Sequence, residues 1–546
     1  MFKVLLKIIL TSLAFAAATA SSVYAHGHCG TMQAVESWIE NKGKVTTAAT
    51  ATQGSCEPED YYDSVYSRTT AHFQIFYVLK GPHSTTEKFV DSLAINLEKA
   101  WDLHVTKNKM RPPQGRDTTV HYLKPVKKGL YGVEVLELNL VRNPRYVHGK
   151  AGFCEDCFAV TNFAGRSNWQ ISEMMIDNDF MVVDTYEPKY DTLNGNGKKC
   201  TYWESTKPIT SAFEKYSYAD KWDKAIRVTT FHELYHAIQV RYLNPYEHMN
   251  FWFEASATGM EEVGAPEVND YFRYIPDFYG QVGKSLDETS FPYGASLFFL
   301  YLHNHIDHLF DKSIWENFSK NSEGTFRQQL SQALVSREKN PQDIFQDFAE
   351  RLSYSGKNSG AVDSSAWYSK DQPYWNSVPY NFTVDGFKPD SSIFAYNYYV
   401  GGIPDLENYA GKASVLLFKD GHAQLRKISN INTLDTIRTE SFSADSILWI
   451  FSRFENPSPL PGKLATKPLR AYPTPWRHGN LCFAPLPPDK KFIEIRNRRG
   501  DLIFREKYDG ETLCLDEGFI KSKMVPGVYR YRAGSSGKTK DLMIIY

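Results

Sequence analysis

Hydrophobic and polar positions along the chain change their period several times, and each change predicts a different element. Apolar runs and strict alternation predict strands at residues 73–78, 133–138 and 174–176. Helical spacing predicts helices from residue 86 to about 103, from 222 to about 243, and across 294–353. The first half of the chain therefore indicates an α+β domain with strands early and helices late.

Composition shifts along the chain predict its domain boundaries. Residues 26–66 form a loop-rich lead segment, and the α+β domain covers residues 67–365. Short apolar runs separated by Gly, Pro, Asn and Asp then predict a β-sandwich domain over residues 376–456. A proline-rich stretch at residues 456–462 marks a second boundary, after which residues 468–546 form a small terminal β unit.

The first 25 residues predict export. Lys3 and Lys7 precede a short apolar run, and Val23-Tyr24-Ala25 places small residues at a cleavage position, with Ala18-Thr19-Ala20 as a second option. That run is too short to span a bilayer comfortably, and no later stretch is apolar enough for a transmembrane helix. We therefore expect an exported protein with no transmembrane segment after signal removal.

Charge and cysteine content narrow the partners and the compartment. With 62 basic and 63 acidic residues the net charge is -1, which gives no support to a nucleic-acid partner. Seven cysteines fit an exported chain. Two local pairs, Cys29 with Cys56 and Cys482 with Cys514, are candidate disulfides. Cys154 and Cys157 resemble a redox or zinc motif, although a structural disulfide suits an exported protein better, and the partner of Cys200 stays open.

The strongest chemical signal is the H-E-x-x-H pattern of His232, Glu233 and His236. It falls inside a predicted helix, for which Ser217 and Asp220 form a capping-box start. Four residues make just over one helical turn, so both imidazoles share one face and can bind one metal ion. The alternative is a pair of core histidines beside a surface glutamate.

A catalytic zinc ion needs a third protein ligand and one open position for water. Glu254 follows His236 by 18 positions, with aromatic residues before it and small residues after it. These suit close packing of a second helix, on which Thr258 and Glu261 are candidates to orient a zinc-bound imidazole. Glu261 or Glu262 is the alternative ligand.

These positions predict a mechanism. Zn²⁺ would lower the pKa of a bound water and polarise a scissile carbonyl. Glu233 would then take the proton of that water and pass it to the leaving amine. Tyr293 is the candidate donor to the oxyanion, with an ordinary packing role as its alternative.

The spacing of these residues resembles that of gluzincin zinc metallopeptidases. The segments that begin at His28, Ile176, His232, Trp252 and Tyr293 are also similar to a family of secreted bacterial putative metalloproteases, over about residues 26–350. This resemblance implies a zincin-like catalytic domain that acts on a protein or peptide substrate, with His232, His236 and Glu254 as ligands and Glu233 as base. It also implies a substrate-binding edge strand at residues 176–180, where Asp177 and Asp179 could instead bind calcium or cap a turn.

The tail is similar to the C-terminal sorting domain of type IX secretion substrates. The likeness begins at residues 471–476, continues through 493–500 and ends at 527–531. It implies a small β-sandwich that secretion machinery reads in the periplasm, and a final location outside the cell or at the surface of a bacterium. A plain accessory β module is the alternative.

Two other functions compete with a secreted zinc-dependent peptidase. One is a non-catalytic surface-binding protein that keeps a zincin fold, although such a protein has no need for Glu233. The other is a different metalloenzyme that uses His26 and His28, which a flexible terminus also explains. Substrate preference does not follow from the sequence.

Overall fold

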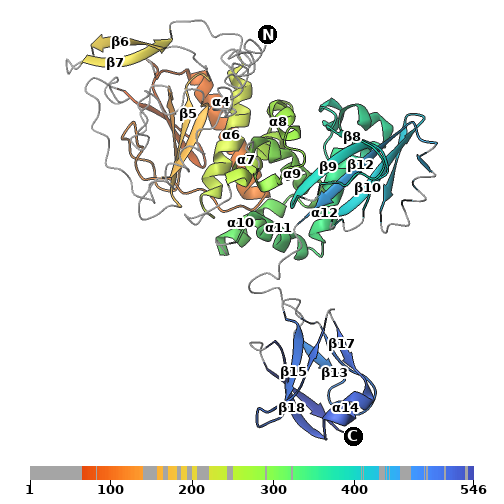
Figure 1. Ribbon diagram of the computed structural model, residues 1–546. Coiled ribbons are helices and arrows are strands. Elements are labelled where there is room, and N and C mark those ends of the chain that lie inside the picture. The colour runs from red at the N-terminus through yellow and green to blue at the C-terminus, as the bar shows by residue number, and fades with distance from the viewer. Residues whose placement is uncertain are drawn as a thin grey trace, which may run out of the picture. The chain divides into compact units, whose positions relative to one another are not determined.

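The computed structural model describes residues 64–80, 83–138, 157–163, 170–180, 186–192, 199–205, 221–242, 250–288, 292–320, 324–390, and most of 392–454 and 469–545. The predicted signal peptide, nearly all of the lead segment with Cys29 and Cys56, and the proline-rich stretch lie outside these ranges. The chain divides into two compact units, residues 1–455 and 456–546 (Figure 1). Among the described residues, no helix is long and apolar enough to cross a membrane.

The first unit begins with a five-stranded sheet of order β1-β2-β3-β5-β4. Its strands are β1 (Tyr66–Thr69), β2 (Phe73–Tyr77), β3 (Tyr131–Leu136), β4 (Ala159–Phe163) and β5 (Ser172–Asp177). The neighbours β2, β3 and β5 are parallel, whereas β1 and β4 pair antiparallel at the two edges. The three predicted strands are thus confirmed as β2, β3 and β5.

The strands β2, β3 and β5 are buried on both faces, which explains their apolar runs. Phe73 and Ile75 of β2 face the helices and join the main core, whereas Phe76 faces the opposite side in a smaller cluster. The predicted edge strand at residues 176–180 is wrong, because β5 lies between β3 and β4 and the edge strand is β4. Asp177 instead closes a turn, where its Oδ1 accepts the N–H of Phe180 at 2.7 Å.

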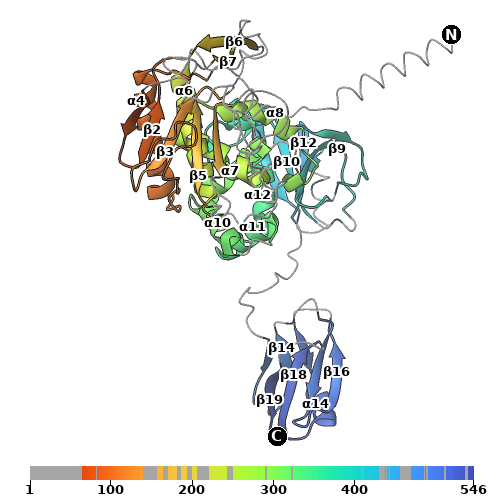
Figure 2. The same ribbon diagram turned by 90° about the vertical axis from the view of Figure 1, so that its left-hand side faces the viewer.

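Helices α4 (Glu87–Trp101) and α6 (Trp222–Gln239) pack together beside this sheet (Figure 2). Thr86 caps α4 by accepting the N–H of Phe89 at 3.1 Å, so the helix begins where the sequence pattern indicated. Helix α6 begins where it was expected but ends four residues before the predicted Leu243. The proposed capping box at Ser217 and Asp220 lies outside the described residues.

Further helices follow α6 and confirm the helical prediction for residues 294–353. Helix α7 (Asn250–Gly264) packs against α6, and a 3₁₀ turn, Pro292–Ala295, packs against α7. The remaining helices are α8 (Ile275–Tyr279), α9 (Ser296–Tyr301), α10 (Phe310–Lys320), α11 (Phe326–Val335) and α12 (Pro341–Leu352).

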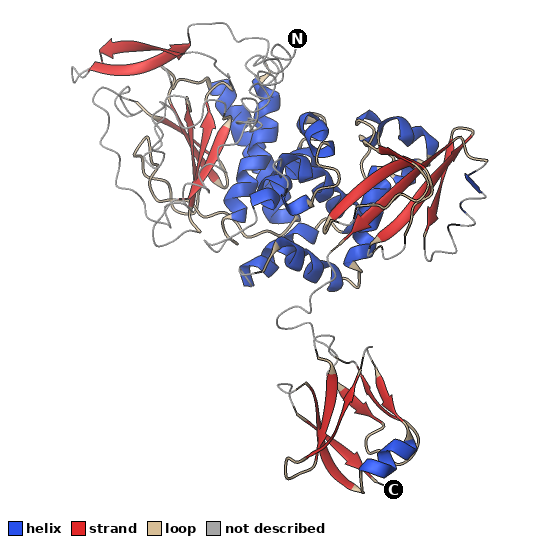
Figure 3. Cartoon of the chain, in the orientation of Figure 1, coloured by secondary structure: helices blue, strands red, loops and turns tan. Residues whose placement is uncertain are grey.

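A second sheet of order β11-β10-β12-β9-β8 closes the first unit. Its strands are β8 (Asn381–Thr383), β9 (Ala395–Gly401), β10 (Lys412–Lys419), β11 (His422–Lys427) and β12 (Ser446–Arg453). Helix α12 covers one face, where Tyr398 donates to the Ala349 carbonyl at 2.9 Å. The helices thus lie between the two five-stranded sheets of this unit (Figure 3), and β6 (Tyr186–Thr192) and β7 (Lys199–Ser205) form a further two-stranded sheet.

The structure therefore differs from the predicted β-sandwich domain over residues 376–456. The described strands of this region form one sheet, and its residues Tyr398, Leu416 and Ile450 belong to the same core as the helices. The short apolar runs in the sequence correctly indicated buried strands, and β9, β10 and β12 are each buried over a continuous run of residues. A helix occupies the place where a second sheet was expected.

The second unit is a small β-sandwich, as predicted for the tail. The first of its two sheets has the strand order β13 (Arg470–Tyr472), β14 (Leu481–Ala484), β17 (Leu513–Leu515). The second has the strand order β16 (Leu502–Lys507), β15 (Phe492–Arg496), β18 (Gly527–Ala533), β19 (Lys540–Ile544). The two sheets and helix α14 (Glu517–Lys523) enclose one core. The predicted disulfide between Cys482 and Cys514 joins β14 to β17.

In the first unit, Cys157 is also disulfide-bonded. This supports the structural interpretation of the motif formed by Cys154 and Cys157 over the redox or zinc interpretation.

Candidate metal centre

His232 and His236 lie on the buried helix α6. Both imidazoles are nearly inaccessible to solvent, and the neighbouring Leu234 and Ile238 are fully buried, so packing holds the helix firmly in place. The ring centroids are 4.5 Å apart, and the two Nε2 atoms approach to 2.9 Å. The one-turn spacing thus places both imidazoles on a common face, as predicted.

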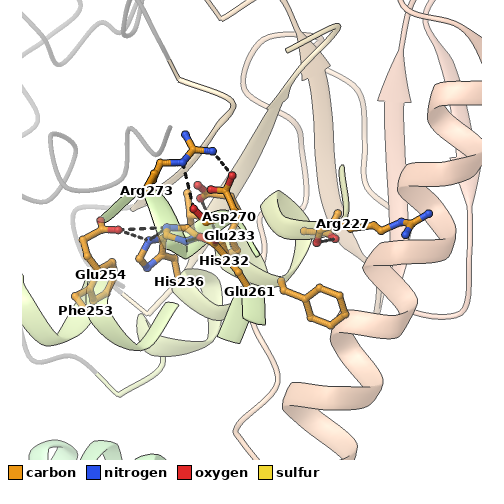
Figure 4. A network of polar contacts seen from close by, with 12 residues as sticks. Arg227, His232, Glu233, His236, Phe253, Glu254, Glu261, Asp270 and Arg273 are labelled. Carbon is orange, nitrogen blue, oxygen red and sulfur yellow. Dashed lines mark hydrogen bonds and ion pairs between the residues drawn. The ribbon is translucent and has the colours of Figure 1, made fainter. Parts of the chain in front are cut away.

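Glu254 of α7 meets both imidazoles. Its Oε2 lies 3.2 Å from Nε2 of His232 and 3.4 Å from Nε2 of His236 (Figure 4). One ligand atom from each of the three residues falls within 4.8 Å of the others, and this is the one such group among the described residues. The structure therefore brings together the three residues that the sequence singled out, and this buried group could hold a metal ion.

Small residues on α7 allow this approach. A Cβ on Gly264 would lie 2.3 Å from the ring of Phe231 on α6, and a Cβ on Gly259 would lie 2.0 Å from Phe299 on α9. Ala255 and Ala257 are fully buried. The run of small residues after Glu254 thus serves the close helix packing that the sequence pattern indicated.

Each imidazole is oriented through its second nitrogen. Nδ1 of His232 lies 2.5 Å from Oε1 of Glu261, and Nδ1 of His236 lies 2.7 Å from Oε1 of Gln239. The amide nitrogen of Gln239 donates to the Phe253 carbonyl at 2.9 Å, which directs its oxygen towards His236. Both Nδ1 atoms therefore act as donors, which leaves the two Nε2 atoms as acceptors in the neutral rings.

This orientation fits a metal cation. Two Nε2 lone pairs and a carboxylate oxygen converge on one point, where without a positive charge they would repel each other. Burial by itself raises the pKa of Glu254, but without a metal ion the adjacent His236 and His232, as protonated imidazoles that donate to the carboxylate, outweigh burial and lower the pKa to about 2. The carboxylate is thus ionised at neutral pH, as a metal ligand must be. Two imidazoles and one carboxylate suit Zn²⁺ but do not by themselves fix the metal.

Glu233 stands apart from the ligand group and faces a pocket. Its Oε2 accepts a hydrogen bond from Thr161 Oγ1 of β4 at 2.7 Å. The pocket beside His232 is lined by Glu233, Glu261, Asp270, Phe158, Val228, Thr229, Tyr274 and Tyr293. The carboxylate therefore lies next to the ligand group without belonging to it, which is the placement predicted for a base.

Tyr293 also reaches this pocket. Its ring stacks on Tyr274, with centroids 5.0 Å apart, and lies 6.4 Å from the His232 ring. The residue comes from the 3₁₀ turn Pro292–Ala295, which packs against α7. The structure thus places Tyr293 at the site, and Tyr274 shares its position beside the same imidazole.

Sequence reasoning found some supporting residues and missed others. Glu261 orients His232, as proposed, whereas Thr258 is buried with no hydrogen-bond partner for its hydroxyl among the described residues. Gln239 was missed although it lies one helical turn after His236, a spacing at which side chains meet. Thr161 gave no signal, because it comes from a strand 72 positions away.

The buried carboxylate of Asp311 on α10 accepts hydrogen bonds from both α6 and α7, the two helices that carry the candidate ligands. Asp311 accepts the indole N–H of Trp252 at 2.7 Å and that of Trp315 at 2.9 Å, and the hydroxyl of Tyr235 also donates to it. Tyr235 is next to His236 on α6, and Trp252 lies two residues before Glu254 on α7. Asp311 thus fixes the backbone on which two of the three candidate ligands sit.

Comparisons with known proteins add little to this geometry. No family model matches the chain, and a search of curated proteins finds no significant match. Among solved structures, a similarity is found to PorZ, described as an essential bacterial surface component of the type-IX secretion system of Porphyromonas gingivalis. It covers 18% of this chain and 14% of that chain, at 17% identity and a TM-score of 0.14. A similarity this small carries no argument about fold or function.

Proposed function

We propose that the chain is a secreted zinc-dependent peptidase of the gluzincin type, with a zincin-like catalytic unit. The observation that carries the proposal is the convergence of His232, His236 and Glu254 beside a pocket that also contains Glu233. A binding protein needs no carboxylate beside its metal ligands, whereas hydrolysis needs a base there. When bound, Zn²⁺ would supply Lewis-acid polarisation and a water of lowered pKa.

The residues around the ligands have separate tasks in this proposal. Glu233 takes the proton from the attacking water and delivers it to the leaving amine. Its bond to Thr161 holds the carboxylate towards the pocket in a fixed orientation. Tyr293 donates its hydroxyl proton in a hydrogen bond to the developing oxyanion. Glu261 and Gln239 keep both imidazoles in the ligating tautomer.

The edge strand β4 is the proposed binding site for the peptide backbone. On its outer side β4 pairs with no other strand among the described residues, and Phe158 just before it lines the pocket. An extended substrate can add to such an edge through main-chain hydrogen bonds, which suits any sequence. Side-chain preference would then come from the pocket walls.

We also propose how the chain is exported. The N-terminal segment directs the chain to the periplasm, and the C-terminal β-sandwich is the address read by type IX machinery. Deletion of residues 469–546 should then leave the protein in the periplasm. Secretion of the truncated chain at the normal level would contradict this proposal.

Hydrolysis of casein by wild-type protein and by Glu233→Gln tests the proposed activity. Loss of the base should lower kcat roughly a hundredfold to ten-thousandfold. Glu262→Gln is the matched control, because Glu262 is a buried glutamate of α7 that does not line the pocket. Equal activity of wild type and Glu233→Gln would contradict the role of Glu233. Absence of hydrolysis in both, for casein and for a peptide library, would favour the binding-protein alternative.

A further inference from the structure

Charge is distributed very unevenly between the two units. Residues 456–546 contain 17 Lys and Arg but only nine Asp and Glu, a net charge of +8. The remaining 45 basic and 54 acidic residues give residues 1–455 a net charge of -9. The nearly neutral whole chain therefore conceals a strongly basic C-terminal unit, and such a charge favours association with an anionic partner.

Five of the 17 basic side chains lie on the outer face of the sheet β16-β15-β18-β19. Along β15, Ile493 and Ile495 point into the core, so Glu494 and Arg496 point to the opposite side. Strand registers bring the following residues to this face: Arg505 and Lys507 of β16, Arg530 and Arg532 of β18, and Asp541 of β19. Five cations and two anions leave this outer face with a net charge of +3.

Glu494 organises the centre of the outer face. Its side chain is fully covered, and its carboxylate accepts bonds from Arg532 at 2.8 Å and 3.0 Å, from Arg496 at 3.3 Å, and from Arg505. Three guanidinium groups around one carboxylate leave two positive charges unbalanced. The single buried anion thus holds the arginines in a fixed array without neutralising them.

The arginines nevertheless stay open to solvent. Their side chains are between 25% and 59% exposed: Arg532 25%, Arg496 33%, Arg505 48% and Arg530 59%. The turn between β15 and β16 adds two more exposed arginines, Arg498 and Arg499. Guanidinium groups suit phosphate oxygens, which they bind with paired N–H donors.

The make-up of the outer face favours a membrane surface over a protein partner. A protein interface normally has an apolar centre from which charged residues are depleted. Here charged side chains occupy the centre, and two strongly exposed apolar side chains, Leu502 and Met543, lie on the outer strands β16 and β19 of the sheet. A basic face without an apolar centre matches the phosphate layer of anionic lipids.

We infer that the outer face of this sheet binds anionic lipid headgroups through their phosphates. This inference does not depend on the peptidase proposal, because every residue in it belongs to the second unit. It predicts that the full-length chain sediments with vesicles containing phosphatidylglycerol but not with pure phosphatidylcholine vesicles. Binding should weaken as salt is added, because screening shortens the reach of the charges.

Two variants with opposite effects test the outer face itself. The double variant Arg505→Gln and Arg530→Gln should bind the anionic vesicles at least about tenfold more weakly, given the usual contribution of each basic residue near a charged membrane. Asp541→Asn removes an anion that is 78% exposed, so it should fold normally and bind more tightly. A gain that disappears when salt is added is electrostatic, whereas apolar surface exposed by misfolding is not screened by salt.

The matched control removes the same charge from another surface. Lys521→Gln with Lys523→Gln alters α14, which packs by Phe519 and Ile520 on the core side of the sheet. This control should reduce binding by less than the arginine variant does. Equal losses in both double variants would overturn the inference, as would no binding by wild type. Binding to polyglutamate but not to anionic vesicles would overturn it in favour of an acidic protein partner.

Discussion

At the scale of single residues, the candidate centre depends on which ring nitrogen each histidine uses. Glu261 and Gln239 engage the two Nδ1 atoms, so both Nε2 atoms face Glu254. Residues that orient ligands in this way usually change metal affinity without touching the metal. The two polar neighbours on α7, Glu261 and Thr258, allow this effect to be separated from general damage to the helix.

Glu261→Gln should weaken zinc binding by about tenfold to a hundredfold, because the ring of His232 loses a charged acceptor. Thr258→Val is the control, since the Thr258 hydroxyl is buried with no partner among the described residues. Competition with a chromogenic chelator measures both affinities. If the two variants lost affinity equally, helix packing and not the Glu261 contact would be responsible.

Tyr293→Phe should lower kcat roughly a hundredfold to a thousandfold while KM changes little, because an oxyanion donor acts mainly in the transition state. The aromatic ring that stacks on Tyr274 is kept, so packing is preserved. Steady-state kinetics on a fluorogenic peptide measure the two constants. A normal kcat would assign Tyr293 to packing and make Tyr274 the next candidate.

The sequence predicted the candidate ligands well because helical geometry alone relates His232 to His236. It also indicated Glu254 through the aromatic and small residues around it. Thr161 could not be predicted, since its contact with Glu233 depends on how β4 is placed beside α6. Local periodicity carries information about one element, whereas contacts between distant elements depend on the packed fold.

At the scale of elements, α6 and α7 are held together by the buried carboxylate of Asp311. Burial raises the pKa of Asp311 to about 6, from an ordinary value of 3.8. Between these values the folded chain keeps a proton that the unfolded chain has lost. The protonated carboxyl therefore stabilises the folded chain at low pH. As the pH rises from about 4 to about 6, this stabilisation is lost, and the free energy of unfolding decreases by up to about 3 kcal/mol.

Asp311→Asn removes this titration. The free energy of unfolding of the wild type minus that of the variant should therefore decrease as the pH rises from about 4 to about 6. Urea unfolding followed by tryptophan fluorescence at several pH values measures it. All other titrating groups are common to both proteins and cancel in the difference. A difference that stayed constant with pH would show that Asp311 does not hold a raised pKa.

Elements were predicted best where the apolar period is long. Helices α4 and α6 begin where their patterns begin, but α6 ends early, at Gln239. The sheet β8–β12 was expected to pack on a second sheet, and instead one face packs on α12. Short apolar runs show that a strand is buried but do not reveal whether a sheet or a helix covers it.

At the scale of the whole molecule, the two units have separate hydrophobic cores. All the candidate site residues belong to the first unit, and the second has its own disulfide. The boundary after Glu455 agrees with the predicted proline-rich boundary at residues 456–462. The earlier boundary, placed near residue 376, is absent because the second sheet shares its core with the helices.

A chain that ends at residue 455 should therefore keep its metal affinity and its kcat/KM on casein within about twofold, because separate cores act as nearly independent folding units. Its thermal unfolding should lose only the transition of the second unit. Calorimetry and peptide hydrolysis measure these quantities. Loss of activity with an intact first transition would show that the second unit takes part in catalysis.

The account as a whole depends on one metal ion held by His232, His236 and Glu254. Metal content per chain, measured by mass spectrometry after zinc repletion and dialysis, tests this most directly. The account predicts one zinc ion in wild type and in Glu233→Gln, and none in His236→Ala or Glu254→Ala that still unfold cooperatively. Wild type without metal, or folded ligand variants that keep a full zinc ion, would contradict it.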